Sequence, residues 1–221
     1  MSDSVYAYYP VLKRTGSFEP GELDQAAGEI GALFEKFSDR VQVRGVYSTT
    51  GLRPDTDLMF WWVADDAPDA CQELLVEIRR TSIGDRLELT HAFLGVTRPA
   101  EFNPDHLPSF LKGEPPKRYL SVYPFVRTED WYLLPRDERA KLLADHGRMG
   151  REFPDVSPNT TSAFGLGDWE WILAFEADDL THIVDCIRRL REAEARRYTK
   201  LDIPFVVGIR SELAEALRAL R

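Results

Sequence analysis

Four histidines are the side chains of this sequence best suited to acid–base or metal chemistry at neutral pH, because imidazole titrates in that range. They are His91, His106, His146 and His182. His182 lies in the polar start of an expected helix, and His91 lies in an alternating strand pattern, so both are interpreted as structural or surface residues. The other two lie in segments where a functional role competes with a structural one.

His146 has two interpretations. A histidine near a helix C-terminus that is followed by Gly147 is a favourable cap, because its partial positive charge meets the exposed carbonyls. The alternative is a single axial ligand to iron. Gly147 and Gly150 would let a flat macrocycle approach the backbone, while Arg148 and Arg151 offer guanidinium groups for carboxylates.

His106 and Tyr123 are the other two candidates. His106 lies in residues 99–116, a stretch with five prolines and one glycine, which predicts a long connecting loop. A loop histidine is either solvated or, beside a pocket, a proton acceptor. Alternation places Tyr119, Ser121 and Tyr123 on one face of a strand, where a tyrosine is a core residue, a hydrogen-bond donor or a one-electron donor.

The remaining reactive residues favour structural roles. No GxSxG, P-loop or HExxH motif is present. Cys71 and Cys186 lie in helical patterns outside any CxxC motif and are expected to be small buried residues. The pair Asp178-Asp179 precedes a helix and is expected to cap it.

Hydrophobic periodicity alternates between strands and helices and predicts a twofold β-α-β-β-α-β series. Val63-Ala-Asp-Asp66 followed by Ile78-Arg-Arg80 is echoed by Glu176-Ala-Asp-Asp179 followed by Ile187-Arg-Arg189. This predicts an α+β fold of two ferredoxin-like repeats that form a dimeric α+β barrel within one chain. The predicted division is an N-terminal half (1–100), a connecting loop (101–117) and a C-terminal half (118–221).

The predicted elements set the expected boundaries. The strands are Val5–Lys13, Val41–Thr49, Asp57–Ala64, Arg86–Val96, Arg118–Val126, a hairpin of Thr160–Leu166 with Trp169–Phe175, and Ile203–Ile209. The helices are Pro20–Phe37, Pro68–Arg80, Arg136–His146, Asp179–Glu192 and Ser211–Leu220, the last with Ser211 as its N-cap.

Composition narrows the function classes. The formal net charge of −9 argues against a nucleic-acid-binding protein. The N-terminal residues contain no apolar signal core, and the longest apolar run, Leu58–Ala64, is too short to span a bilayer. We therefore expect a cytoplasmic protein with no membrane span.

Several segments together resemble the coproheme decarboxylases of the chlorite dismutase-like superfamily. The resemblance is carried by Tyr119-Leu-Ser-Val-Tyr-Pro-Phe-Val-Arg127, Trp131-Tyr-Leu-Leu-Pro135, His146-Gly-Arg-Met-Gly-Arg151 and Gly167-Asp-Trp-Glu-Trp171. The run Arg98-Pro-Ala-Glu-Phe-Asn103 with His106 resembles the actinobacterial branch. The resemblance covers about residues 41–210.

The resemblance implies a homopentamer that converts iron coproporphyrin III (coproheme) to heme b. Two propionates are oxidatively decarboxylated to vinyl groups, with hydrogen peroxide as oxidant and CO2 released. A transient contact with coproporphyrin ferrochelatase is a further expectation.

The same resemblance implies a role for each matching residue. His146 matches the proximal iron ligand, Tyr123 the tyrosine whose radical takes a hydrogen from the propionate, and His106 the distal histidine. Arg127 and Arg151 match basic positions near the propionates, and Trp171 matches a tryptophan near the substrate.

One departure from the wider family matters. Chlorite dismutases carry a distal arginine about a dozen residues beyond the proximal histidine, whereas residues 156–161 read VSPNTT. Chlorite decomposition is therefore not expected. Two alternatives to the enzyme stay open at this point: a heme-binding or heme-transfer protein of the same fold, and a ferredoxin-like protein that binds no heme.

Overall fold

The computed structural model describes residues 4–65, 68–102 and 107–221, which form two compact units. Unit 1 comprises Met1–Thr97 and Val206–Arg221, and unit 2 comprises Arg98–Phe205. The sequence instead placed everything from residue 118 onward in one C-terminal half. The last segment groups with unit 1 because its strand pairs with an N-terminal strand. No helix in the described part of the chain is long and apolar enough to cross a bilayer.

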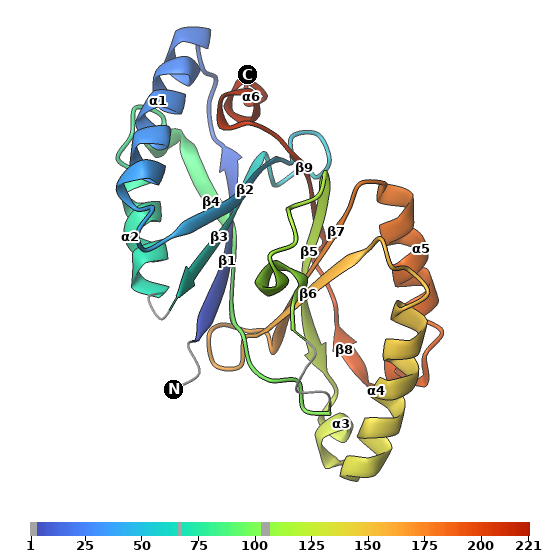
Figure 1. Cartoon of the computed structure of the whole chain (residues 1–221). Helices are drawn as coiled ribbons and strands as arrows, with labels where there is room; N and C mark the ends of the chain where they lie inside the picture. Colours follow the sequence, from blue (N-terminus) through green and yellow to red (C-terminus); the bar gives the residue numbers. More distant parts are fainter. Residues whose placement is uncertain (1–3, 66–67, 103–106) are drawn as a thin grey trace. The chain divides into compact units, whose positions relative to one another are not determined.

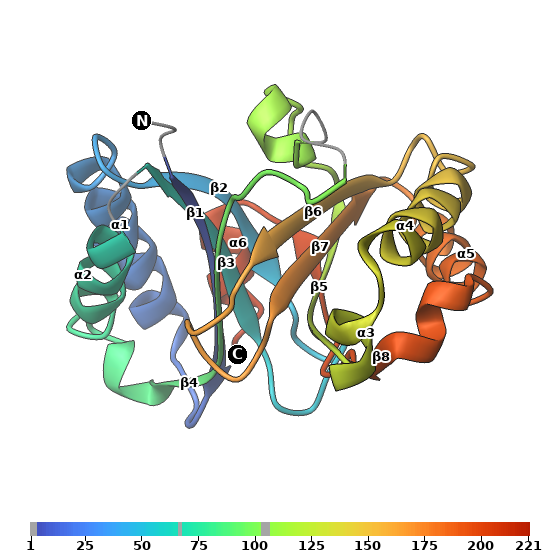
Figure 2. The ribbon, with the colours of Figure 1, turned by 90° about the horizontal axis from the view of Figure 1, so that it is seen from below.

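Unit 1 is an antiparallel sheet with helices on one side (Figures 1 and 2). Its strands pair in the order β4-β1-β3-β2-β9. The first four follow the ferredoxin-like β-α-β-β-α-β connection. The elements are β1 (Val5–Arg14), α1 (Pro20–Lys36), β2 (Gln42–Ser48), β3 (Leu58–Asp65), α2 (Pro68–Ile78), β4 (Leu87–Val96), β9 (Val206–Arg210) and α6 (Leu213–Arg218).

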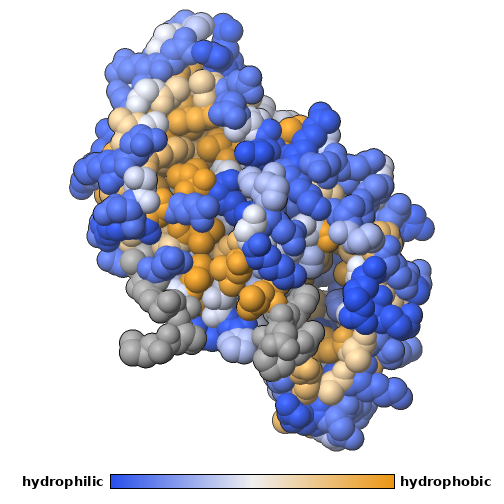
Figure 3. Space-filling model, in the orientation of Figure 1, coloured by the Kyte–Doolittle hydropathy of each residue, from blue (hydrophilic) through white to orange (hydrophobic). Residues whose placement is uncertain are grey.

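The helices of unit 1 pack onto the sheet through a continuous apolar core. Leu23, Ala26 and Ile30 of α1 are buried at helical spacing. They join one cluster with Phe60 and Trp62 of β3 and with residues of α2 and α6. In Figure 3 the outer side of α1 is mainly hydrophilic, and hydrophobic side chains lie inward of it.

Unit 2 repeats the ferredoxin-like pattern with the strand order β6-β7-β5-β8, again antiparallel. Figure 2 shows α4 and α5 on one side of this sheet. The elements are β5 (Tyr119–Arg127), α3 (Glu129–Leu133), α4 (Arg136–Gly150), β6 (Ser157–Ser162), β7 (Trp171–Ala177), α5 (Leu180–Leu190) and β8 (Thr199–Leu201), with short 3-10 helices η2 (Ser109–Lys112) and η3 (Glu194–Tyr198). The predicted mixed α+β class and the hairpin are confirmed.

Two details near the C-terminus were wrong. The predicted strand Ile203–Ile209 begins too early: its part from Val206 onward is β9, whereas residues 203–205, which include Pro204, form no strand. Proline has no N–H to donate to a ladder, which is consistent with the later start. Ser211 is not the N-cap of α6: Glu212 is, and the Ser211 hydroxyl donates to the Ile209 carbonyl.

Smaller predictions are confirmed. Cys71 and Cys186 are buried free thiols. Asp179 is the N-cap of α5, and its carboxylate accepts the Thr181 backbone N–H at 2.9 Å. His182 is half-exposed and pairs with Asp155.

Candidate functional site

A pocket of about 280 Å³ lies within unit 2, between its sheet and its helices. This is just below the range of about 300–1,000 Å³ that is typical of ligand sites. Most of the wall is apolar or aromatic, and the polar part is dominated by charged groups. The lining residues are Ala100, Glu101, Tyr123, Phe125, Arg127, Trp131, Leu143, His146, Thr160, Trp171, Leu173, Phe175, Ile187, Leu190, Arg191, Ala195, Arg196, Thr199 and Asp202.

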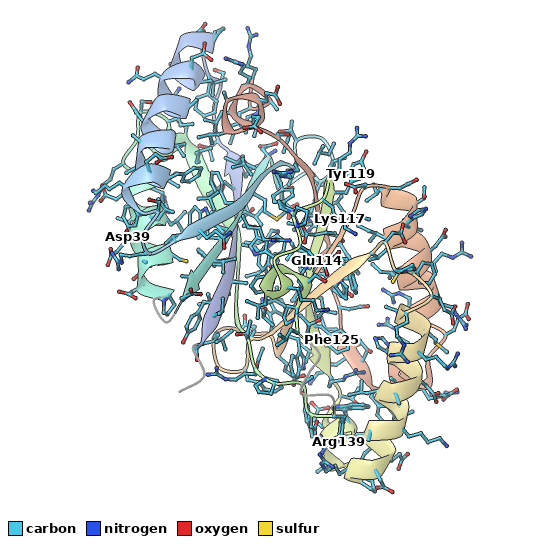
Figure 4. The ribbon with its side chains drawn as sticks, viewed as in Figure 1. Asp39, Glu114, Lys117, Tyr119, Phe125 and Arg139 are labelled. Atoms are coloured by element: carbon cyan, nitrogen blue, oxygen red, sulfur yellow. The ribbon has the colours of Figure 1, made fainter. Side chains whose placement is uncertain are left out.

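Strand alternation builds the sheet wall of this pocket. Tyr123 lies opposite Leu173, and Phe125 opposite Trp171, in the β5–β7 ladder. All four side chains therefore point to one face. Phe125 is labelled on β5 in Figure 4. Arg127, at the end of β5, also lines the pocket. The pairing of β5 with β8 shifts its register just before this residue, between Val126 and Arg127.

His146 forms part of the opposite, helical wall. It and Leu143 are three residues apart on α4, so both face inward. Burial, and then the positive charge of Arg127, lower the pKa of His146 to about 4. The imidazole is therefore neutral at pH 7 and keeps a lone pair for a metal.

This placement overturns the helix-cap interpretation of His146. The helix α4 continues to Gly150, so His146 lies one turn inside its end. A cap of that kind depends on a charged imidazolium, which burial and Arg127 disfavour.

Tyr123 is almost completely buried, with 6% of its surface exposed. Its ring stacks on Phe205 with 4.2 Å between centroids and lies 6.0 Å from Phe175. Burial raises the pKa of the phenol well above its usual range, and Asp202 adds to that rise. Tyr123 is therefore a protonated phenol at the pocket wall.

Arg127 places a positive charge in the same pocket. Its guanidinium lies 4.2 Å from the centroid of Trp131 and 4.7 Å from that of Phe125, and it donates to the Ala195 carbonyl at 2.9 Å. Burial lowers its pKa to about 10, so the group remains charged at neutral pH. An anionic group entering the pocket would meet this cation.

Two further basic side chains on the pocket wall, Arg191 and Arg196, were missed by the sequence analysis. Arg191 and Arg196 both pair with Asp202, at 2.8 and 2.7 Å. The arginine-rich run after α5 was the available signal. Periodicity predicts that the side chains of such a run are solvated. It does not indicate that Asp202, later in the chain, pairs with two of these arginines.

Thr160 is the β6 residue in the pocket lining. Its neighbour Asn159 points to the other face, where its side chain accepts the Phe110 N–H at 2.9 Å and donates to Glu176 at 3.2 Å. The segment that leads into β5, where Figure 4 labels Glu114 and Lys117, is also tied down there: the Lys117 N–H donates to Glu176. These bonds hold Asn159 on the face away from the pocket, so that Thr160, with its small hydroxyl, faces the pocket.

A family model described as chlorite dismutase matches residues 23–211. The chain belongs to the chlorite dismutase family. A coproheme decarboxylase from Mycolicibacterium smegmatis is 44% identical over 207 residues, which cover 91% of this chain and 89% of that protein. The structure of a mutant chlorite dismutase from Candidatus Nitrospira defluvii matches with a TM-score of 0.88 and 21% identity, over 100% of this chain and 96% of that chain. This last likeness concerns the fold alone.

In this chlorite dismutase family member, the pocket gathers four of the six residues singled out in the sequence: Tyr123, Arg127, His146 and Trp171. Arg151 is exposed at the C-cap of α4 and is not among the lining residues. His106 lies outside the described residues.

Proposed function

We propose that this protein is a coproheme decarboxylase. It would convert two propionates of iron coproporphyrin III to vinyl groups, with hydrogen peroxide as oxidant. For each propionate, one acid side chain and one peroxide give one vinyl group, CO2 and two waters. The observation that carries the proposal is that His146 and Tyr123, from opposite walls, line one pocket in a chain 44% identical to a coproheme decarboxylase.

The pocket fits this substrate chemically. Leu143, Leu173 and Phe175 are among the apolar side chains that suit a flat macrocycle. Arg127 suits its carboxylate arms. The iron of the bound substrate supplies the activation of peroxide.

Each wall then has a separate task. We assign iron ligation to the neutral His146 imidazole, which faces little competition from protons at pH 7. We assign to Tyr123 the abstraction of a hydrogen atom: its oxidised phenol, a phenoxyl radical, takes the hydrogen atom from the propionate. Because burial raises the pKa of this phenol, it keeps its proton until it is oxidised, and it then loses an electron and the proton to become the radical that takes the hydrogen atom.

The carboxylate contacts can be refined. Of the two predicted carboxylate contacts, Arg127 lies in the pocket lining. The lining also contains Arg191 and Arg196, which both pair with Asp202. These three arginines are better placed than Arg151 for propionates inside the pocket. Trp171 forms apolar wall next to Phe125. The homopentamer, the ferrochelatase contact and the cytoplasmic location stay predictions.

The test is mass spectrometry of the porphyrin while peroxide is titrated into the coproheme complex. We expect stepwise loss of two carboxyl groups and heme b as the product, while coproheme treated without protein should not follow this sequence. If the four-propionate substrate persists while the porphyrin bleaches, the protein binds heme compounds without decarboxylating them.

A further inference from the structure

A continuous set of aromatic side chains connects the pocket wall of unit 2 with its surface. Trp171 lines the pocket. The ring of Phe164 lies 5.3 Å from that of Trp171 and 6.1 Å from that of Tyr132, edge-on in both cases. Because electron tunnelling falls steeply with distance, side chains in contact exchange electrons much faster than separated ones.

Tyr132 differs from the other tyrosines in its surroundings. All eight tyrosines lie in the described part of the chain, and Tyr132 is the most exposed of them, with 40% of its surface accessible. Its hydroxyl donates to the Glu170 carboxylate at 2.6 Å. A short bond from a phenol to a carboxylate is a ready path for a proton.

This proton path matters because a phenol is hard to oxidise while it keeps its proton. Glu170 also accepts the Arg127 N–H at 2.7 Å, which fixes the carboxylate in place beside Tyr132. Burial, and then the hydrogen bond of its hydroxyl to Glu170, raise the pKa of Tyr132, so the phenol is protonated before any oxidation. Loss of an electron and transfer of the proton to Glu170 would therefore occur together.

We propose that Tyr132 is a second redox-active tyrosine, which receives oxidising equivalents from Trp171 and gives its proton to Glu170. The primary oxidant is hydrogen peroxide acting through the bound iron porphyrin, so in the working enzyme this inference rests on the proposed function. In the step, the Trp171 radical cation gains one electron and becomes a neutral tryptophan again. Tyr132 loses that electron and becomes a neutral phenoxyl radical, and its proton binds to Glu170.

The chemical consequence is a second route for oxidising equivalents: those that do not reach a propionate through Tyr123 are transferred to Tyr132. A radical on Tyr132 is accessible to small reductants in solvent. Trp171, which lines the pocket beside the substrate, is then spared from lasting oxidation. Tyr123 is buried and stacked on Phe205, so its radical stays with the substrate.

The first test uses the ligand-free protein, and it is independent of porphyrin chemistry. A photogenerated ruthenium(III) complex oxidises the protein, and dityrosine fluorescence and covalent dimers are measured. We expect Tyr132→Phe to remove most of the dityrosine. Glu170→Gln, which keeps an acceptor oxygen but is a far poorer base, should slow its formation by about tenfold or more.

Tyr198→Phe is the matched control, because the Tyr198 ring lies 5.7 Å from Trp131, another pocket tryptophan. It should leave the dityrosine yield unchanged. Circular dichroism and melting curves establish that each variant is folded. Undiminished dityrosine in folded Tyr132→Phe, or an unchanged rate in Glu170→Gln, would overturn the proposal.

The second test connects Tyr132 with the pocket. Peroxide is added to the coproheme complex of Tyr123→Phe, and the sample is frozen for electron paramagnetic resonance. We expect a tyrosyl radical that disappears in Tyr123→Phe/Tyr132→Phe and is strongly reduced in Tyr123→Phe/Trp171→Phe. A tyrosyl radical that persists in the first double variant would refute the path. If the complex consumes no peroxide, the proposed function fails, and the ligand-free test still decides the role of Tyr132.

Discussion

Tyr8 in unit 1 and Ser121 in unit 2 occupy equivalent positions in two antiparallel ladders. Tyr8 pairs with Trp62, and Ser121 pairs with Phe175. The equivalence continues along the strands, with Leu12 opposite Leu58 in one unit and Phe125 opposite Trp171 in the other. By this register Phe60 corresponds to Leu173.

The larger side chains in unit 1 fill the space beneath its helices. Phe60 and Trp62 are fully buried, and their rings stack 5.4 Å apart, with Tyr8 5.9 Å from Trp62. Unit 2 has serine, leucine and phenylalanine where unit 1 has tyrosine, phenylalanine and tryptophan.

The covering helices differ in the same sense. Leu23, Ala26 and Ile30 of α1 are buried, whereas α4 has no fully buried residue and turns Leu143 and His146 toward the pocket. The strand order is the same in both units, so the side chains that the sheet and its covering helices place between them, and not the topology, separate a packed core from a binding site.

Removing the pocket's reactive phenol should have the largest effect. Tyr123→Phe should still bind coproheme, because the ring and its stacking on Phe205 remain. Decarboxylation should fall by at least about 10⁴-fold, since a phenyl ring has no hydroxyl hydrogen to exchange. The rate is followed by mass spectrometry of the porphyrin.

Tyr119→Phe is the matched control for that variant, because Tyr119 shares the strand face but is not among the pocket-lining residues. It should react at the wild-type rate. A Tyr123→Phe protein that is equally fast would remove Tyr123 from the mechanism.

Equivalent truncations in the two units should separate core from pocket. Phe60→Ala should cost about 3–5 kcal/mol in the free energy of unfolding, because it opens a cavity in a packed core. Leu173→Ala should cost only about 1–2 kcal/mol, because Leu173 already borders the pocket and is half-buried. Urea unfolding of both variants measures the difference. Equal losses would mean that the pocket in unit 2 is as tightly packed as the core of unit 1.

Periodicity was enough to predict most of the elements. The strands carrying Tyr123 and Trp171 and the helix carrying His146 all appear, because their apolar spacing matches the side that each one buries. The short helix α3 was missed, because one turn is too short to show a period. The strand β8 was missed for the same reason, since it has only three residues.

The site was predictable only where a residue type is rare or a resemblance identifies it. His146 and Tyr123 were found in that way. Arg191, Arg196 and Asp202 were not, because the sequence contains many arginines and aspartates, and only tertiary structure shows which of them meet at a pocket. Arg151 follows His146 closely in sequence but emerges on the exposed end of the helix.

Filling the pocket should make unit 2 resemble unit 1. Leu173→Trp places a bulky ring at the position that corresponds to Phe60 and should weaken coproheme binding by about 100-fold, or about 2.7 kcal/mol. The protein should remain folded, because the ring enters an existing cavity. Absorbance titration with coproheme measures the affinity. Leu173→Met, which nearly conserves volume, should bind as the wild type does, and unchanged affinity of Leu173→Trp would place the porphyrin elsewhere.

Protonation of His146 should have a smaller effect, which is a pH-dependent loss of stability specific to the pocket of unit 2. The folded-state pKa is lowered to about 4, below the unfolded value near 6.5. The unfolded chain therefore binds the proton first. Stability of the ligand-free protein should fall as the pH drops from about 6.5 toward 4, and the His146 contribution should be constant outside that window. By pH 5 the loss should be about 2 kcal/mol.

The contribution of His146 is isolated by comparison with His146→Gln, which cannot titrate. The difference in the free energy of urea unfolding between the two proteins should change between pH 7.5 and pH 5, with the wild type losing ground. A difference that stays flat over this range would mean that the imidazole is as well hydrated in the folded protein as in the unfolded chain. Its pKa would then be about 6.5, so the imidazole would be partly protonated near neutral pH, and the argument that the pocket keeps the ligand neutral for iron would fail.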